Sequence, residues 1–239
     1  MRLVAWNCCM ALHRKAAALM ALRPDVAVIS ECAEPGRLRG KVADFPACDA
    51  VWVGDNPNKG LGVFAFNGYK AALARNHDPA IRHVAPVRVD GPARFNLLAV
   101  WVQLDGGGKA EPGPMLRALD AYGRFCKAAP TVAAGDLNNH VLWDKSGHAG
   151  NHANAVARLE ALGMVSAYHA DRGVAPGEEP EPTHYWRDRR KDGPTYHIDY
   201  VFLPRPWTGR MREMSVGGFE AWCGNGLSDH VPLVVDVDM

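Results

Sequence analysis

The sequence has no cysteine pair at the spacing of a zinc motif and no long apolar run. Its six cysteines never occur as Cys-x-x-Cys, so we expect no structural zinc site. Met1-Arg2 leads directly into a strand-like run without the apolar segment of a signal peptide, and no stretch is long enough to span a membrane. We therefore expect free thiols in a reducing cytoplasm and no membrane partner.

The chain also lacks an excess of charge of either sign. Its formal net charge is +1 over 239 residues, which gives no overall attraction to nucleic acid, although a locally basic face is compatible with it. With 48% hydrophobic and 22% charged residues and no internal repeat, the composition is that of an ordinary globular protein. We expect one domain over residues 1–239, acting as a monomer.

Apolar runs separated by turn residues predict a strand-rich α/β domain. Helices are expected at 13–22, 114–128 and 151–162, and strands at 3–6, 26–30, 50–53, 62–66, 83–89, 95–103, 131–134, 197–203, 211–217 and 231–237. The opening order of strand, helix and strand suggests a mixed sheet covered by helices. Asn56-Pro57-Asn58 and Asn67-Gly68 indicate turns between antiparallel neighbours, and the Gly, Pro and charged residues of 172–194 indicate a loop.

Polar side chains stand at the ends of five predicted strands. Taken singly, each has an ordinary explanation, such as a turn or a side chain in solvent. Taken together, they supply the carboxylates, amides and imidazole that hydrolysis of a phosphoester requires. They are Asn7, Glu31, Gly135-Asp136-Leu137-Asn138, His197-Ile198-Asp199-Tyr200 and Leu227-Ser228-Asp229-His230.

This ordered set resembles the motifs of the endonuclease/exonuclease/phosphatase superfamily, the metal-dependent phosphodiesterases that include DNase I and exonuclease III. The resemblance extends from Trp6-Asn7 to Ser228-Asp229-His230. It implies a DNase I-like four-layer α/β sandwich, in which two mixed, mainly antiparallel sheets are flanked by helices. It also implies a Mg²⁺ or Mn²⁺ cofactor.

The resemblance implies a metal site with Glu31 as the principal ligand. Asp229 is expected on the opposite side of the metal, and Asn7 is expected to support the site through its amide oxygen or through its NH₂ group. The chain departs from the family at Cys9, where some members carry an aspartate that contacts the metal. Because cysteine is a poor ligand for Mg²⁺, we expect the site to depend more on Glu31 and Asp229, or to accept Mn²⁺.

The resemblance also implies the catalytic groups. Asp136 is expected to accept a proton from the attacking water, and Asn138 to donate to the charge that develops on the phosphate. Asp199 is expected to orient His230, which contacts the phosphate or transfers a proton; which of Asp136 and His230 is the base stays open. A second departure is Trp101, where relatives place a His or Tyr, and for Trp101 we expect core packing.

Several further residues are candidates for binding substrate. A basic and aromatic loop combines positive charge with ring faces, which suits nucleic-acid strands, although such loops are usually only solvated. A second group, Arg205, Arg210 and Arg212, would extend this track if it also borders the cleft. The remaining candidates have packing or surface roles as alternatives. The candidate set is His140, Trp186, Arg187, Arg189, Arg190 and His197.

We therefore expect a metal-dependent hydrolase of phosphoester bonds that acts on nucleic acid, with DNA as the expected substrate, as an endonuclease or an exonuclease. A phosphatase or phosphodiesterase acting on a small molecule or a lipid headgroup is the alternative, and the near-neutral charge favours it modestly. A binding module that has lost its chemistry is a third reading, and the presence of Glu31, Asp136, Asp199 and His230 argues against it.

Overall fold

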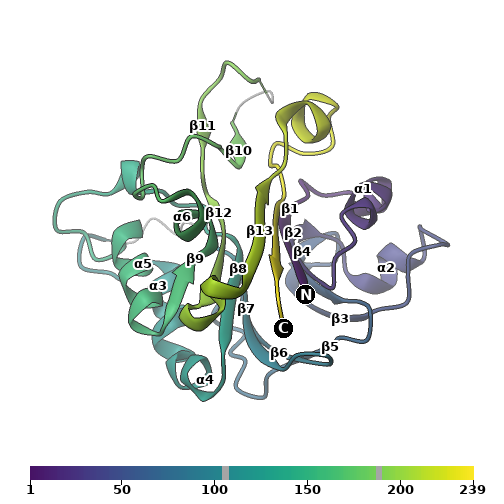
Figure 1. The fold of residues 1–239 in the computed structure, drawn as a ribbon, viewed down its shortest axis with the longest axis horizontal. Helices are drawn as coiled ribbons and strands as arrows, with labels where there is room; N and C mark the ends of the chain where they lie inside the picture. Colours follow the sequence, from purple (N-terminus) through teal and green to yellow (C-terminus); the bar gives the residue numbers. More distant parts are fainter. Residues whose placement is uncertain (104–107, 187–189) are drawn as a thin grey trace.

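The computed structural model describes residues 1–103, 108–186 and 190–239, which form two packed β-sheets with helices outside them (Figure 1). The first sheet contains β1 (Arg2–Asn7), β2 (Val26–Cys32), β3 (Asp49–Asn56), β4 (Lys59–Ala65), β13 (Met211–Val216) and β14 (Leu233–Val237). Its strand order is β13-β14-β1-β2-β4-β3.

The second sheet comes from one continuous segment of the chain, inserted between β4 and β13. It contains β5 (Lys70–Leu73), β6 (Val84–Asp90), β7 (Phe95–Trp101), β8 (Thr131–Asp136), β9 (Met164–Ser166) and β12 (Asp199–Pro204), in the order β5-β6-β7-β8-β12-β9. A separate hairpin pairs β10 (His184–Tyr185) with β11 (Thr195–Tyr196). Each six-stranded sheet has one parallel strand pair, and its other pairs are antiparallel.

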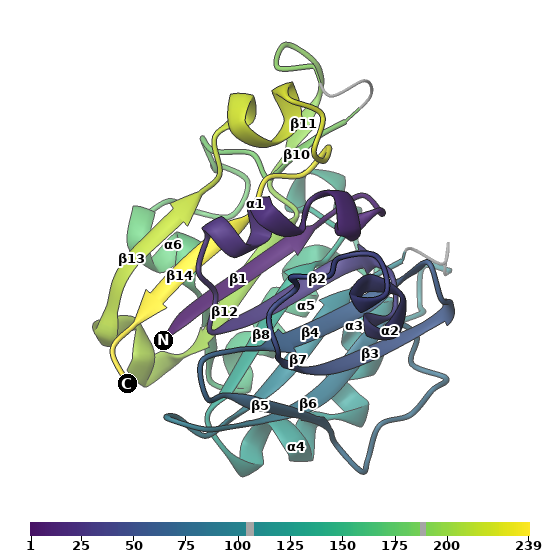
Figure 2. The same ribbon diagram turned by 90° about the vertical axis from the view of Figure 1, so that its right-hand side faces the viewer.

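Helices cover the outer sides of the two sheets, as Figures 1 and 2 show. On the side of the first sheet lie α1 (Ala16–Ala21) and α2 (Pro35–Arg39), and on the side of the second lie α3 (Pro114–Ala121), α4 (Gly123–Ala128), α5 (His152–Ala161) and α6 (Ala167–Arg172). Short helical turns are Leu12–Arg14, Val141–Trp143, Arg205–Arg210 and the π-helical Glu220–Gly224. Within the described ranges, none of these helices has the length and apolar character needed to cross a membrane.

Three buried layers hold the sandwich together, and β1 shows how the sequence creates them. Side chains alternate between the two faces of a strand, so Leu3 and Ala5 enter the layer between the sheets while Val4 and Trp6 face the layer under α1 and α2. A third layer joins the second sheet to α3 and α5. Because both faces of β1 are covered, its sequence is a continuous apolar run.

Most predicted strands are confirmed, and the differences have local causes. The helix predicted over 13–22 is a 3₁₀ turn followed by α1, and that predicted over 114–128 divides at Tyr122 into α3 and α4. Asn56-Pro57-Asn58 does join antiparallel neighbours, β3 and β4, whereas Asn67-Gly68 leads from one sheet into the other. The short elements α2, α6, β5, β9, β10 and β11 were not predicted, because their few residues carry little periodic signal.

The strand pairing brings the predicted polar residues to one end of the sandwich. In the β1–β14 pair Ala5 lies opposite Leu233, so Asn7 approaches the residues just before β14. In the β8–β12 pair Asp136 lies directly opposite Asp199. In Figure 1 this is the upper end, where β10 and β11 lie.

Candidate active site

Asn7 links two carboxylates that come from different sheets. Its Nδ2 lies 2.9 Å from Asp136 Oδ2 and 3.5 Å from Glu31 Oε1, while its Oδ1 accepts a hydrogen bond from the backbone N–H of Cys9 at 3.0 Å. The side chain is buried, with 3% of the residue exposed. Asn7 therefore uses its NH₂ group to hold Glu31 and Asp136, while its amide oxygen is occupied by Cys9.

Glu31 reaches the site because β2 bulges at this residue. Ser30 pairs with Leu61 and Cys32 with Gly60, so Glu31 is the extra residue, and its φ is 59°. A bulge re-aims a side chain, and a non-glycine residue in the left-handed region is held there at a cost, often at a functional site. The Glu31 carboxylate lies 3.3 Å from Lys59 Nζ, which provides a positive charge beside it.

Asp136 is fully buried among hydrogen-bond donors. The backbone N–H of Asn138 donates to its Oδ1 at 2.8 Å, and Asn138 Nδ2 lies 3.0 Å from its Oδ2 and 2.8 Å from Val102 O. Burial and the nearby Asp199 raise the pKa of Asp136 to about 7. The two amide hydrogens of Asn138 are thus used by Asp136 and Val102, so in this arrangement the donation to phosphate expected from the sequence is not available.

The glycine before Asp136 is required by close strand packing. Gly135 has a φ of 132°, and a Cβ at this position would lie 1.9 Å from Val100 O. Only glycine tolerates this backbone conformation and this contact. Gly135 therefore lets β8 lie against β7 while its next residue turns into the site.

His230 and Asp199 form a buried pair that also joins the two sheets. His230 Nδ1 lies 2.7 Å from Asp199 Oδ2. Burial lowers the pKa of His230, but the charge and hydrogen bond of Asp199 outweigh it and raise that pKa to about 10. Asp199 is held in turn by Thr183, whose Oγ1 accepts the backbone N–H groups of Ile198 and Asp199, each at 3.0 Å. The pair can thus hold a protonated imidazole at neutral pH.

Asp229 and Cys9 stand beside this pair at the more open side of the site. The Asp229 side chain is 36% exposed. The Cys9 thiol donates a hydrogen bond to Asp229, and burial together with the charges of Asp229 and Glu31 raises the pKa of Cys9. Ser228 ties the segment to β1, because its Oγ donates to Asn7 O at 2.7 Å and accepts the His230 N–H at 3.1 Å. The Cys9 thiol therefore occupies the space near the two expected metal ligands.

The donors at this site fit a hard divalent cation by their chemistry. The contacts described above include four carboxylates, those of Glu31, Asp136, Asp199 and Asp229. They include only two cationic side chains, Lys59 and His230. Carboxylate oxygens are the ligands that Mg²⁺ and Mn²⁺ prefer. In the described residues, two groups place three ligand atoms within 4.8 Å of one another, and neither contains Glu31: Asp136, Asp199 and His230, and His184, Asp229 and His230.

Two of the predicted substrate-binding histidines are not in the cleft. His197 is 2% exposed, its Nδ1 lies 2.8 Å from Glu181 O, and its ring packs 4.2 Å from that of Tyr168. His140 is 3% exposed, and its Nε2 lies 3.1 Å from Glu179 Oε2. Both rings are therefore turned into the protein, as the packing alternative for His197 expected, whereas the alternative for His140 was a surface loop.

The structure describes only part of the basic loop. Arg187 and Arg189 lie outside the described residues. Arg190 forms an ion pair with Asp192, at 3.0 Å, and Trp186 is 44% exposed.

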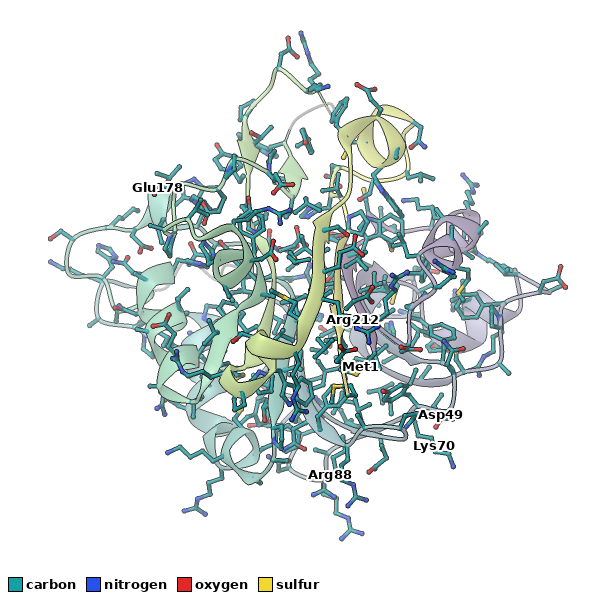
Figure 3. All side chains as sticks on the ribbon, in the orientation of Figure 1. Met1, Asp49, Lys70, Arg88, Glu178 and Arg212 are labelled. Atoms are coloured by element: carbon teal, nitrogen blue, oxygen red, sulfur yellow. The ribbon has the colours of Figure 1, made fainter. Side chains whose placement is uncertain are left out.

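The second basic group does not border the site. The turn Arg205–Arg210 follows β12, and Asp199, which begins β12, lies at the site, so this turn stands at the other end of the sandwich. Arg212 pairs with Asp238 and lies away from β10 and β11 (Figure 3). The condition under which Arg205, Arg210 and Arg212 would extend the basic loop is therefore not met in this structure.

Three residues at the site had no predicted role. Thr183 holds Asp199, Lys59 lies beside Glu31 and 5.4 Å from the centre of the Trp101 ring, and His184 stacks on His230 with 4.3 Å between ring centres. Trp101 itself is 3% exposed in the layer between the sheets, which confirms core packing. Thr183 and His184 stand in a loop that was read for its Gly, Pro and charged residues, and Lys59 follows a turn, so none of the three carries a motif.

The fold agrees with that of known nucleases over the whole chain. The endonuclease domain of TRAS1, a telomere-specific non-LTR retrotransposon, matches 100% of this chain and 98% of its own with a TM-score of 0.65 and 15% identity. The 3' phosphatase NExo from Neisseria, in complex with a product DNA hairpin, matches 100% of both chains with a TM-score of 0.67 and 17% identity. An AP endonuclease from Archaeoglobus fulgidus matches 100% of both chains with a TM-score of 0.66 and 17% identity.

These likenesses define the class of fold, and the expected DNase I-like sandwich is confirmed. No protein-family model matches the chain, and no curated protein matches it. At 13–17% identity the solved structures establish the architecture. The chemistry must be argued from the residues of this chain.

Proposed function

We propose that the protein is a Mg²⁺- or Mn²⁺-dependent hydrolase of phosphoester bonds that acts on DNA. The observation that carries this proposal is the hydrogen-bonded set Glu31–Asn7–Asp136 beside Asp199–His230. Asn7 holds the carboxylates of Glu31 and Asp136, and Asp199 holds the imidazole of His230 next to them. One end of the sandwich therefore carries both a proton acceptor, Asp136, and a positively charged side chain, His230. Two of the similar proteins are endonucleases and the third is a 3' phosphatase bound to a product DNA hairpin, which supports hydrolysis of phosphoester bonds in DNA.

Glu31 and Asp229 are the residues that would hold the metal, and Asn7 supports them by fixing Glu31. When bound, the metal would polarise the phosphoryl oxygens and offset the negative charge of the site. Because Cys9 lies beside Asp229 and is subject to the charge of Glu31, at a position where a carboxylate would add a hard ligand, we expect weaker binding of Mg²⁺ than of Mn²⁺.

The proton chemistry is assigned to Asp136 and His230. Asp136, with a pKa of about 7, is poised to accept a proton from water near neutral pH. His230, with a pKa of about 10, stays protonated and presents a positive charge to the phosphoryl oxygens, held in place by Asp199. Asn138 positions Asp136 through two hydrogen bonds.

We further propose that residues 1–239 form one catalytic domain that acts as a monomer. The six cysteine thiols fit a reducing cytoplasm.

The test is hydrolysis of supercoiled plasmid, with bis(p-nitrophenyl) phosphate and a panel of phosphomonoesters beside it. Each substrate is assayed with Mg²⁺, Mn²⁺ and EDTA, for the wild type and for His230→Ala. Metal-dependent nicking that is lost in His230→Ala would support the proposal. Turnover of the small esters with an intact plasmid would assign the protein to small phosphoesters instead, and no turnover of any substrate would refute a hydrolase.

A further inference from the structure

A row of aromatic rings leads away from His230 toward the protein surface. His184 stacks on His230 with 4.3 Å between ring centres and an interplanar angle of 28°. Tyr196 lies 6.5 Å from His184, and Trp143 lies 4.7 Å from Tyr196. We call His184, Tyr196 and Trp143 the aromatic row.

Three separate parts of the chain build this row. His184 and Tyr196 are cross-strand partners in the β10–β11 hairpin, so they present their side chains on the same face. Trp143 comes from the 3₁₀ turn Val141–Trp143, which follows the Asp136 segment. The hairpin is fixed to the site through His184, which forms an isolated bridge with His230. The row therefore starts at a proposed catalytic residue.

The outer end of the row is exposed to an extent that packing does not explain. Trp143 is 38% exposed and its neighbour Leu142 is 68% exposed. Part of the Trp143 side chain is thus available at the surface, next to a second large apolar side chain. Exposed apolar clusters of this kind mark binding surfaces more often than single exposed residues do.

Three cations of the described residues are paired with carboxylates, which weakens their attraction to a phosphate backbone. Formal net charge is only +1. Lys59 is paired with Glu31, Arg190 with Asp192 and Lys191 with Glu220. A protein that binds duplex DNA without sequence preference depends on many unpaired cations. Base stacking on aromatic rings adds binding energy that does not come from cations, and it tolerates any sequence.

We propose that the aromatic row binds unpaired nucleobases, so that the enzyme acts on single-stranded or locally unpaired nucleic acid in preference to a continuous duplex. This inference rests on the proposed function, and it adds the class of substrate. In a duplex the base faces are stacked on one another and cannot cover Trp143 and Tyr196. In a single strand they are free, and a strand seated on the row would place a phosphate beside His230.

The test measures binding separately from chemistry. A fluorescein-labelled dT₁₂ oligonucleotide and a labelled 12-base-pair duplex are titrated with protein in EDTA, and binding is followed by anisotropy. The variants are Trp143→Ala, Trp143→Phe, which keeps a stacking ring, and Leu73→Ala, a control that removes a 39% exposed apolar side chain on β5. Circular dichroism and thermal unfolding confirm that each variant folds.

We expect Trp143→Ala to weaken binding of dT₁₂ about tenfold, as the loss of one base stack does. Trp143→Phe and Leu73→Ala should each bind dT₁₂ with an affinity within about twofold of that of wild type. The duplex should bind more weakly than dT₁₂ and respond little to Trp143→Ala. Equal binding of dT₁₂ by wild type and Trp143→Ala, or tighter binding of the duplex, would overturn the inference. If dT₁₂ binding depends on Trp143 but no substrate is hydrolysed with any metal, the aromatic row is still a site for unpaired bases, while the proposed function and the substrate preference that rests on it fail.

Discussion

Thr183 offers a sharp test of how the site is held together. Its side chain is completely buried, and its single hydroxyl oxygen accepts the backbone N–H groups of both Ile198 and Asp199. In Thr183→Val the shape of the side chain is kept and the acceptor is lost. The two N–H groups then have no partner from Thr183, and the residue that orients His230 loses its anchor.

The size of the effect follows from these two hydrogen bonds. A buried donor left without an acceptor costs about 1–3 kcal/mol, and the extra buried methyl group of valine returns about 0.8 kcal/mol. For two such donors, we expect Thr183→Val to lower the free energy of unfolding by about 1–5 kcal/mol. For a domain of this length the melting temperature should fall by roughly 2–20 °C.

The assay combines urea unfolding with hydrolysis of the best substrate from the panel above. Thr183→Ser keeps the acceptor and should lose only about 1 kcal/mol for its missing methyl group. Thr208→Val is a matched control, because the Thr208 hydroxyl is exposed and donates only to Arg205 O at 2.9 Å; it should change the unfolding free energy by less than about 0.5 kcal/mol. We expect kcat to fall about 10- to 100-fold in Thr183→Val at a temperature where it is folded.

Two results would refute this reasoning. If Thr183→Val unfolds within about 0.5 kcal/mol of wild type, the two N–H groups do not depend on the hydroxyl. If it is destabilised as expected but keeps the kcat of wild type, then Thr183 supports the fold and has no part in orienting Asp199.

Three further predictions concern the charges of the site. Glu31→Ala should abolish metal-dependent hydrolysis and, by isothermal titration, weaken Mn²⁺ binding about 10-fold or more; unchanged Mn²⁺ affinity would remove Glu31 from the metal site. Cys9→Asp adds a carboxylate near Asp229, so it should raise the affinity for Mg²⁺ about tenfold relative to the affinity for Mn²⁺. An unchanged ratio of the two affinities in the same titration would contradict this prediction. Burial raises the pKa of Asp136 from 3.8 to about 7, and the pKa of His230 rises from 6.5 to about 10 despite its burial. Because both pKa values are higher in the folded protein than in the unfolded chain, both groups stabilise the fold at low pH. The contribution of Asp136 is lost as pH rises through about 7, and that of His230 as pH rises through about 10. In EDTA, Asp136→Asn should therefore be more stable than wild type by about 1–3 kcal/mol at pH 8 and by much less at pH 4. Urea unfolding at the two pH values measures this, and an equal difference in unfolding free energy at both would disprove the prediction.

The sequence predicted the strands and the strand ends, because both depend on local pattern. Asn7, Asp136 and Asp199 each stand where a buried apolar run stops or begins, and the structure brings them together at one end of the sandwich. Their roles remain predictions. What the local pattern could not show is which residues meet across the two sheets.

Contacts between distant residues explain what the sequence did not predict. Lys59 reaches Glu31 only because β4 pairs with β2 and because β2 bulges at Glu31, and neither fact has a local signal. His140 and His197 looked like candidates because they flank motif residues, but their rings turn into the protein, toward Glu179 and Tyr168. Proximity along the chain places a residue near a site without deciding which way its side chain points.

The insertion of the second sheet into the first has a consequence for how the protein is made. The strands of the first sheet come from β1–β4 and, after the whole second sheet, from β13 and β14. During synthesis on the ribosome, β1 stays without its β14 neighbour until residues 233–237 have emerged, and closing that long loop is slow. Asp229 and His230 directly precede β14. A nascent chain that has not reached these residues therefore lacks two members of the candidate site, and it exposes the open edge of β1 to neighbouring chains on a polysome.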